Sequence, residues 1–191
     1  MLIKSINGKT PHIPKTCYVA KNATIVGDVT LGDSCSVWFN AVIRGDVNTI
    51  TIGNKVNIQD GAIIHCTYQK HPTIIGNNVS IGHNAIVHGC TIQDNVLIGM
   101  GAIIMDNSLI ETHTIVAAGA VVLQNTTVTS RSIWAGVPAK KIKDITASEF
   151  LGEIERIANN YVLYSSWFKK PIKLSIYQVV KNYFYRRLKK I

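Results

Sequence analysis

The chain has 191 residues, of which 47% are hydrophobic and 16% are charged, and its formal net charge at pH 7 is +9. That length allows one domain with a real core, and that composition excludes a disordered chain. Apolar runs of about 18 residues, which a membrane-spanning helix needs, are absent, and the N-terminus lacks the apolar core of a signal peptide; we therefore expect a cytoplasmic protein.

The positive charge is concentrated near the C-terminus. Residues 1–155 contain 11 Lys/Arg and 11 acids, whereas residues 156–191 contain nine Lys/Arg and no acid. The main body is therefore not expected to bind nucleic acid, and any anionic partner would meet the basic tail.

A six-residue repeat runs through most of the chain. Aliphatic residues recur every six positions in four series, which are Ile25, Leu31, Val37 and Ile43; Ile52, Ile58 and Ile64; Ile75, Ile81 and Val87; and Ile92, Ile98, Ile104, Ile110, Val116, Val122 and Val128. This period fits neither a helix nor simple strand alternation. It is typical of a parallel β-helix, in which three hexads form one triangular coil. We predict a β-helix domain over residues 1–145.

The repeat is interrupted in three places, after Ile43, after Ile64 and after Val87. With three hexads in each coil, the coils are 31–37–43, 52–58–64, 75–81–87, 92–98–104 and 110–116–122. Every interruption then follows the third hexad, so the irregular connections stack at one corner. Loops gathered on one edge of such a fold often mark its functional face.

The residues that follow the third hexads form a column of Arg44, His65, His88 and Met105. Adjacent coils lie about 4.8 Å apart, so His65 and His88 are predicted to be neighbours that can hold one ion. His83 follows Ile81 near the second face and points elsewhere, where it can complete a site with another copy of the chain. Catalytic zinc takes three protein ligands and a water. The spacing favours a metal site of His65, His83 and His88, and the alternative of corner histidines without a shared role stays open.

The remaining histidines, His12, His71 and His113, are not assigned to the metal. Other polar residues gather near the column, with Arg44 and Asp46 at the same corner and Asn57, Gln59 and Asp60 on the adjacent face. Individually such residues often form hydrogen bonds in turns. As a group they are predicted to orient a histidine, a water or a small-molecule substrate.

Four cysteines, Cys17, Cys35, Cys66 and Cys90, show no metal-binding spacing. In a cytosolic chain of this length we expect free thiols.

The end of the chain is predicted to be helical. Residues 146–165 form a helix that packs on the β-helix, and Thr146 and Glu149 provide a capping box. Residues 166–191 form a basic extension, with a second helix predicted to start at Pro171. That helix either packs on its own oligomer or docks, through residues 169–191, on an anionic membrane surface or an acidic partner.

Several motifs together resemble one family. "RGDV", "NIQDGAIIH", "IGHNAIVHGC", "GMGAIIMD" and "GVPAK" are similar to those of the gamma-class carbonic anhydrases, within the bacterial hexapeptide-repeat transferase-like proteins. The resemblance covers roughly residues 10–165. It implies a left-handed β-helix and a homotrimer with zinc, or iron or another divalent metal, held between subunits. His65 and His88 would come from one chain and His83 from the next.

The resemblance also implies roles for individual residues. Arg44 and Asp60 match a pair that ties subunits together, Asn57 and Gln59 match residues around the metal-bound water and the substrate, and Tyr161 matches an active-site tyrosine. The implied activity is the hydration of CO₂ to bicarbonate by zinc hydroxide.

The sequence departs from the family pattern where archaeal members carry glutamates that move protons. Val47 follows Asp46, and the 66–73 loop "CTYQKHPT" contains no acid. Proton removal would fall to buffer, His71 or Tyr68, so weak activity is expected. The alternatives are an acyltransferase or thioesterase acting on CoA esters, or a non-catalytic trimeric scaffold.

Overall fold

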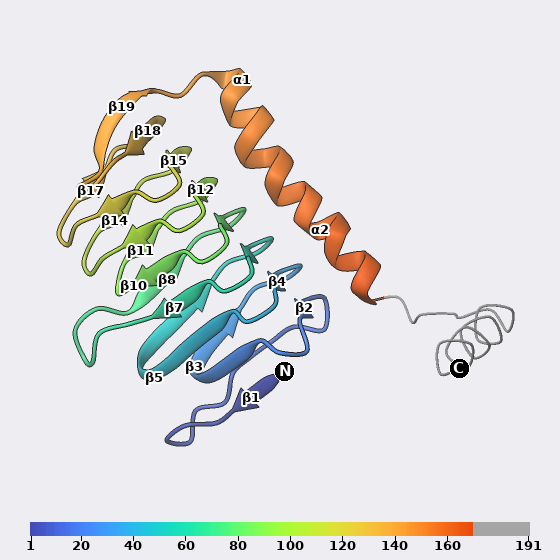
Figure 1. The fold of residues 1–191 in the computed structure, drawn as a ribbon. Helices are drawn as coiled ribbons and strands as arrows, with labels where there is room; N and C mark the ends of the chain where they lie inside the picture. Colours follow the sequence, from blue (N-terminus) through green and yellow to red (C-terminus); the bar gives the residue numbers. More distant parts are fainter. Residues whose placement is uncertain (170–191) are drawn as a thin grey trace, which may run out of the picture.

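Short parallel strands stacked in triangular coils make up most of the protein (Figure 1), and the computed structural model describes residues 1–169. Each complete coil contributes one strand to each of three faces. We name the faces after the order of the hexads: in one coil the first face carries Ile52, the second face Ile58 and the third face Ile64.

The strands of each face pair with their neighbours in the adjacent coils. The first face contains β8 (Thr73–Ile75), β11 (Thr91–Ile92), β14 (Leu109–Ile110) and β17 (Thr127–Val128). The second face contains β2 (Tyr18–Val19), β4 (Ser36–Val37), β6 (Asn57–Ile58), β9 (Ser80–Ile81), β12 (Val96–Ile98), β15 (Thr114–Val116), β18 (Ser132–Ala135) and β19 (Lys140–Asp144). The third face contains β7 (Ile63–His65), β10 (Ile86–His88), β13 (Ile103–Ile104) and β16 (Val121–Val122). The first and third faces are joined by β3 (Thr24–Leu31) and β5 (Val42–Ile52), and β1 (Leu2–Lys4) pairs with β3.

The strand register confirms the hexad frame. Ile64 pairs with Val87, and Val87 pairs with Ile104, so each aliphatic residue lies over its equivalent in the next coil. These side chains point into the coil and are fully buried. The aliphatic columns form the hydrophobic core, and burial of such side chains is the main force that holds the coils together. The prediction of a left-handed parallel β-helix followed by a C-terminal helix is confirmed.

One corner is built differently from the other two. At the edge between the third and first faces, β5 runs without interruption around the corner, and the loop after His65 reaches Thr73 before the next strand begins. The irregular connections therefore do stack at one corner, which we call the histidine corner because His65 and His88 end their strands there.

The C-terminal segment begins with a capped helical turn, α1 (Ala147–Glu149). The Thr146 side chain accepts from the Glu149 amide while the Glu149 carboxylate accepts from the Thr146 amide, which is the predicted capping box. A π-helical stretch follows over Phe150–Glu155, and α2 (Arg156–Lys169) continues to the end of the described residues. The helix thus extends beyond residue 165.

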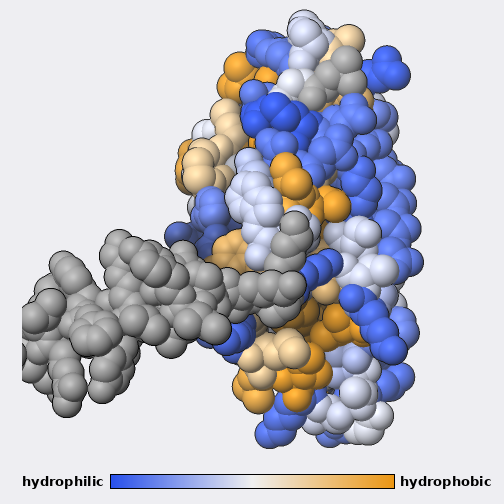
Figure 2. Space-filling view, turned by 90° about the vertical axis from the view of Figure 1, so that its right-hand side faces the viewer, coloured by the Kyte–Doolittle hydropathy of each residue, from blue (hydrophilic) through white to orange (hydrophobic). Residues whose placement is uncertain are grey.

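Helix α2 returns alongside the second face from the last coils toward the first (Figure 1). Two residues of this C-terminal helical segment, Ile154 and Ala158, are buried. Near its end, Trp38 packs edge-on against Tyr161 and Phe168, with ring centroids 5.4 and 5.3 Å apart. The view from the helix side shows apolar patches among polar residues on this surface (Figure 2). The amphipathic helix therefore covers one side of the coil with its apolar stripe.

Within residues 1–169 no helix is both long and apolar enough to cross a membrane. The second predicted helix, from Pro171, and nearly all of the basic extension lie outside the described residues. The four cysteines are free thiols, as predicted.

Candidate metal centre

His65 and His88 are brought together by the register of the third face. They end β7 and β10, and they are direct partners in the parallel pairing of these strands. Arg44 follows Ile43, which pairs with Ile64, and Met105 follows Ile104, which pairs with Val87. The predicted column at this corner is therefore present.

The two imidazole rings face each other through nitrogen atoms. His65 Nδ1 lies 3.0 Å from His88 Nε2, and the ring centroids are 5.0 Å apart. The remaining nitrogen of each ring meets a carboxylate: His65 Nε2 lies 3.1 Å from Asp46 Oδ1, and His88 Nδ1 lies 2.5 Å from Asp106 Oδ1. Each histidine is thus held in one orientation by its own aspartate.

The surroundings keep both aspartates ionised. Burial alone would raise the pKa of Asp46, but hydrogen bonds from Arg44 and His65 outweigh it and lower that pKa. Burial likewise opposes ionisation of Asp106, and hydrogen bonds from His88 and Thr67 overcome it, so its pKa is also lowered. The pKa of His65 is lowered, mainly by burial, which favours the neutral ring.

The hydrogen bonds of the two histidines and their two aspartates indicate a place for a cation between the rings. An ionised carboxylate only accepts hydrogen bonds, so the ring nitrogens that face Asp46 and Asp106 carry the hydrogens. In a neutral imidazole the other nitrogen then offers a lone pair. His65 Nδ1 and His88 Nε2 would present lone pairs to each other at 3.0 Å, an arrangement that a proton or a metal ion between them stabilises. The donor set fits a divalent metal that prefers imidazole, such as zinc.

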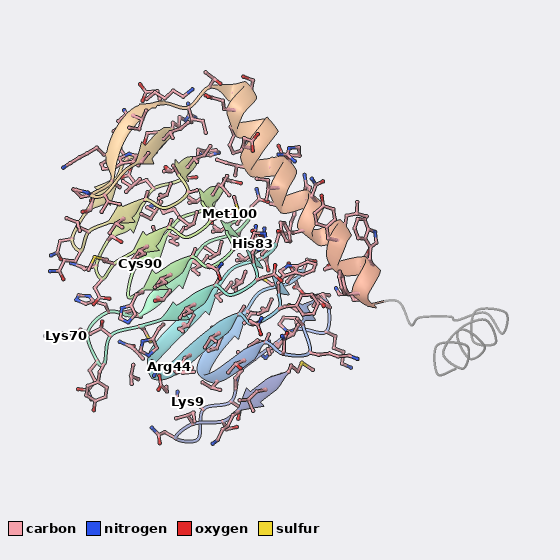
Figure 3. All side chains as sticks on the ribbon, viewed as in Figure 1. Lys9, Arg44, Lys70, His83, Cys90 and Met100 are labelled. Carbon is pink, nitrogen blue, oxygen red and sulfur yellow. The ribbon has the colours of Figure 1, made fainter. Side chains whose placement is uncertain are left out.

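His83 lies at a different corner, between the second and third faces. Its Nδ1 is 2.9 Å from Asp60 Oδ2, and within residues 1–169 its Nε2 has no hydrogen-bond partner. Figure 3 shows His83 on the side of α2, whereas Arg44 and Cys90 lie on the other side of the coil. The described part of a single chain does not gather three metal-binding side chains in one place. A three-histidine site therefore requires His83 of a second copy.

The other predicted site residues divide between these two corners. Asn57 and Gln59 are buried on the second face, where Gln59 Nε2 donates to Asn57 Oδ1 at 2.9 Å and Asn57 Nδ2 donates to Ser80 Oγ at 2.7 Å. At the histidine corner, Arg44 Nη1 lies 2.6 Å from Asp46 Oδ2. Within one chain, therefore, Arg44 pairs with Asp46 and not with Asp60, and the predicted polar cluster around all three histidines is split.

A cavity of about 410 Å³ lies between the second face and α2, next to His83. Its lining includes Gln59, His83, Met100 and Tyr161. Burial, helped by the nearby Asp60 carboxylate, raises the pKa of Tyr161 to about 12. The phenol therefore stays protonated at neutral pH and can donate a hydrogen bond.

Sequence reasoning missed Asp106 and its partner Thr67. Thr67 Oγ1 donates to Asp106 Oδ2 at 2.7 Å, so Asp106 contacts both His88 and the inserted loop. The available signal was positional: Asp106 directly follows Met105, which is the next member of the column after His88. His113, which was not assigned, packs against Phe150 with ring centroids 4.5 Å apart.

The chain is similar to several known proteins. The family model for the bacterial transferase hexapeptide (six repeats) matches residues 89–124. A carbonic anhydrase of Geobacillus kaustophilus is 39% identical over 168 residues, which cover 88% of this chain and 91% of that protein. The mitochondrial gamma carbonic anhydrase 1 of Arabidopsis thaliana is 43% identical over 164 residues, or 83% of this chain. The chain spans 59% of the length of that Arabidopsis protein.

Among solved structures, a hexapeptide transferase family protein from Anaplasma phagocytophilum matches with a TM-score of 0.83 and 37% identity. The match covers 87% of this chain and 98% of that one. Nearly the whole described fold is therefore shared with it.

Proposed function

Because this chain belongs to the gamma-class carbonic anhydrase family, we propose that it is a metal-dependent enzyme that hydrates CO₂ to bicarbonate at the interfaces of a homotrimer. The observation that carries the proposal is the arrangement of His65 and His88, whose nitrogens face each other at 3.0 Å while their other nitrogens are held by carboxylates.

In the proposed site, His65 and His88 of one chain and His83 of a neighbouring chain hold a zinc ion, with iron or another divalent metal as the alternative. Three neutral imidazoles leave the full positive charge on the metal, which lowers the pKa of a coordinated water from 15.7 toward about 7 and so supplies hydroxide at neutral pH. The trimer is supported by the separation of His83 from the histidine corner, because a cyclic oligomer can place His83 of one copy beside the histidine corner of the next.

The chain's own residues have distinct tasks in this proposal. Asp46 orients His65, and Arg44 holds Asp46 in place. On the side of His83, Asp60 orients the imidazole.

The buried amides of Asn57 and Gln59 bind each other, which fixes the direction of the remaining Gln59 donor beside the cavity. Tyr161, with its protonated hydroxyl, contributes a second donor for an oxygen of CO₂ or bicarbonate.

Proton removal limits the expected rate. The inserted loop has no acid, and its Tyr68 side chain is exposed to solvent. In the proposal the proton leaves to buffer, or through His71 or Tyr68, so turnover is weak at low buffer concentration and rises as buffer is added.

Two alternatives use the same fold. A CoA-ester acyltransferase or thioesterase would need a general base and a groove for the pantetheine arm, and a scaffold would need no chemistry at all. One matched structure is described as a hexapeptide transferase family protein, and for this reason the experiment below also tests acyl transfer. Neither alternative accounts for three histidines that are each paired with an aspartate.

The test is metal analysis of protein purified without chelators, combined with stopped-flow CO₂ hydration across a range of buffer concentrations. We expect one zinc or iron per chain and buffer-dependent hydration. Protein without bound metal would refute the proposal. Bound metal without hydration at any buffer concentration, together with turnover of acetyl-CoA, would favour the acyl-transfer alternative.

A further inference from the structure

We propose that Asp106 and Thr67 form a positioning pair that fixes the ring of His88 for metal binding. The proposal rests on the metal site proposed above and extends it to two residues outside the predicted site. It also gives the inserted loop a role, although this loop has no acid.

The first support is the use of both carboxylate oxygens of Asp106. Oδ1 lies 2.5 Å from His88 Nδ1, and Oδ2 accepts from Thr67 Oγ1 at 2.7 Å. With Oδ2 held by the threonine hydroxyl, the carboxylate cannot rotate away from the ring. Asp106 therefore keeps the hydrogen of His88 on Nδ1, and Nε2 is the nitrogen that faces His65.

The second support is the anchoring of Thr67 itself. Its amide donates to the carbonyl of His71 at 3.0 Å, which closes the loop into a turn. Its carbonyl accepts from Asn48 Nδ2, also at 3.0 Å. Because the backbone of Thr67 is fixed from both sides, its hydroxyl is presented to Asp106 in a defined direction.

At the other end of the same loop, Thr73 forms hydrogen bonds with the backbone at His65 and directly after His88. The buried Thr73 donates from Oγ1 to the His65 carbonyl at 2.5 Å and accepts from the Gly89 amide at 3.0 Å. At one end of the loop Thr67 therefore supports the His88 ring through Asp106, and at the other end Thr73 bonds to the His65 carbonyl and to the amide that follows His88. The loop that separates the hexads acts as a support for the site.

The third support is the glycine next to His88. Gly89 has a φ of +52°, and a Cβ built there would lie 2.3 Å from Asp106 Oδ1. Any larger residue would occupy the space through which Asp106 reaches the ring. The sequence therefore leaves room for this contact at the position where it is needed.

The experiment measures metal affinity of the full-length protein without reference to activity. Cobalt(II) and zinc are titrated into metal-free protein, with the visible cobalt spectrum and competition against a chromophoric chelator as readouts. We expect Asp106→Asn to weaken metal binding about 10- to 100-fold and to alter the cobalt spectrum. Thr67→Val is expected to weaken binding in the same direction, and Thr67→Ser, which keeps the hydroxyl, should bind as the wild type does.

A matched control lies in the first coils, where Thr16 Oγ1 donates to Asp33 Oδ1 at 2.7 Å, far from the histidine corner in the chain of coils. Thr16→Val and Asp33→Asn remove a similar bond and should leave metal affinity unchanged. Wild-type protein that binds no cobalt would remove the proposed metal site itself. Cobalt binding by the wild type with unchanged affinity in Asp106→Asn and Thr67→Val would overturn only the positioning role.

Discussion

His65 Nδ1 faces His88 Nε2 across 3.0 Å, on neighbouring coils and with an aspartate behind each ring. The strand register sets this relationship, because the two residues are direct partners in a parallel pair. The stack of coils therefore places the two proposed metal ligands next to each other without any contribution from a loop.

Removing either ring should abolish metal binding. We expect His65→Ala and His88→Ala to contain less than about a tenth of the wild-type metal. Each variant keeps only two of the three protein ligands that a catalytic zinc site uses. Elemental analysis after purification without chelators measures this. His12→Ala, at an exposed position in the first coils, is the control and should retain its metal; full occupancy in either site variant would contradict the assignment.

Subunit mixing tests whether His83 comes from a neighbour. His65→Ala and His83→Ala chains each lack every complete site, but a mixed trimer places an intact histidine corner of one against an intact His83 of the other. After unfolding and refolding together, about a quarter of the sites should bind metal, from random assembly of a symmetric trimer. A mixture of His65→Ala with His88→Ala should recover none, because both losses lie on the same corner. Equal recovery in the two mixtures would refute the shared site.

Gly89→Ala should weaken metal binding by more than backbone strain at this position alone would. Besides its positive φ, the new Cβ would displace Asp106 from His88, so we expect metal affinity to fall at least about tenfold. Gly119→Ala is the control, since Gly119 also has positive φ, of +67°, but has nothing within 4 Å of the added carbon. It should lose only about 1 kcal/mol of stability, measured by urea unfolding, with metal affinity unchanged.

Docking of α2 depends on Trp38. This side chain is only 6% exposed and contacts Tyr161 and Phe168 of the helix. Trp38→Ala should lower the free energy of unfolding by about 3–5 kcal/mol, because it removes a large buried aromatic group. Trp167→Ala, at a residue that is 58% exposed, should cost less than about 1 kcal/mol. Equal losses in urea titrations would mean that Trp38 does not hold the helix in place.

Glu149 makes the capping box depend on pH. Hydrogen bonds from Lys143 and Thr146 lower the pKa of Glu149 from 4.5 to about 2. A lowered pKa in the folded state stabilises the protein above the unfolded value, and this contribution is lost as the pH falls through 4.5 toward 2. Glu149→Gln should therefore be less stable than the wild type at pH 7, and the difference should shrink below pH 4.5.

Chemical denaturation at several pH values measures that difference. Glu153→Gln, in an exposed pair with Arg156, is the comparison and should change stability little. A Glu149→Gln deficit that persists unchanged at low pH would contradict the assignment of the box.

The sequence alone determined the coil and indicated which histidines are the proposed ligands. A six-residue period can bury its aliphatic residues only in a triangular coil, so Ile64 and Val87 fix the frame and place His65 beside His88. The residue types then indicate the chemistry, because imidazoles at that spacing suit a metal.

Only the tertiary structure decided how the polar residues are shared among the corners. Asp46 holds His65, Asp60 holds His83, and Asp106, which lies outside the hexad positions that sequence reasoning examined, holds His88. A repeat gives each residue its face and its coil, but the direction of a side chain at a corner depends on the loop packed against it. The contact of Thr67 with Asp106 is such a case, since it joins an inserted loop to a turn residue 39 positions away in the sequence.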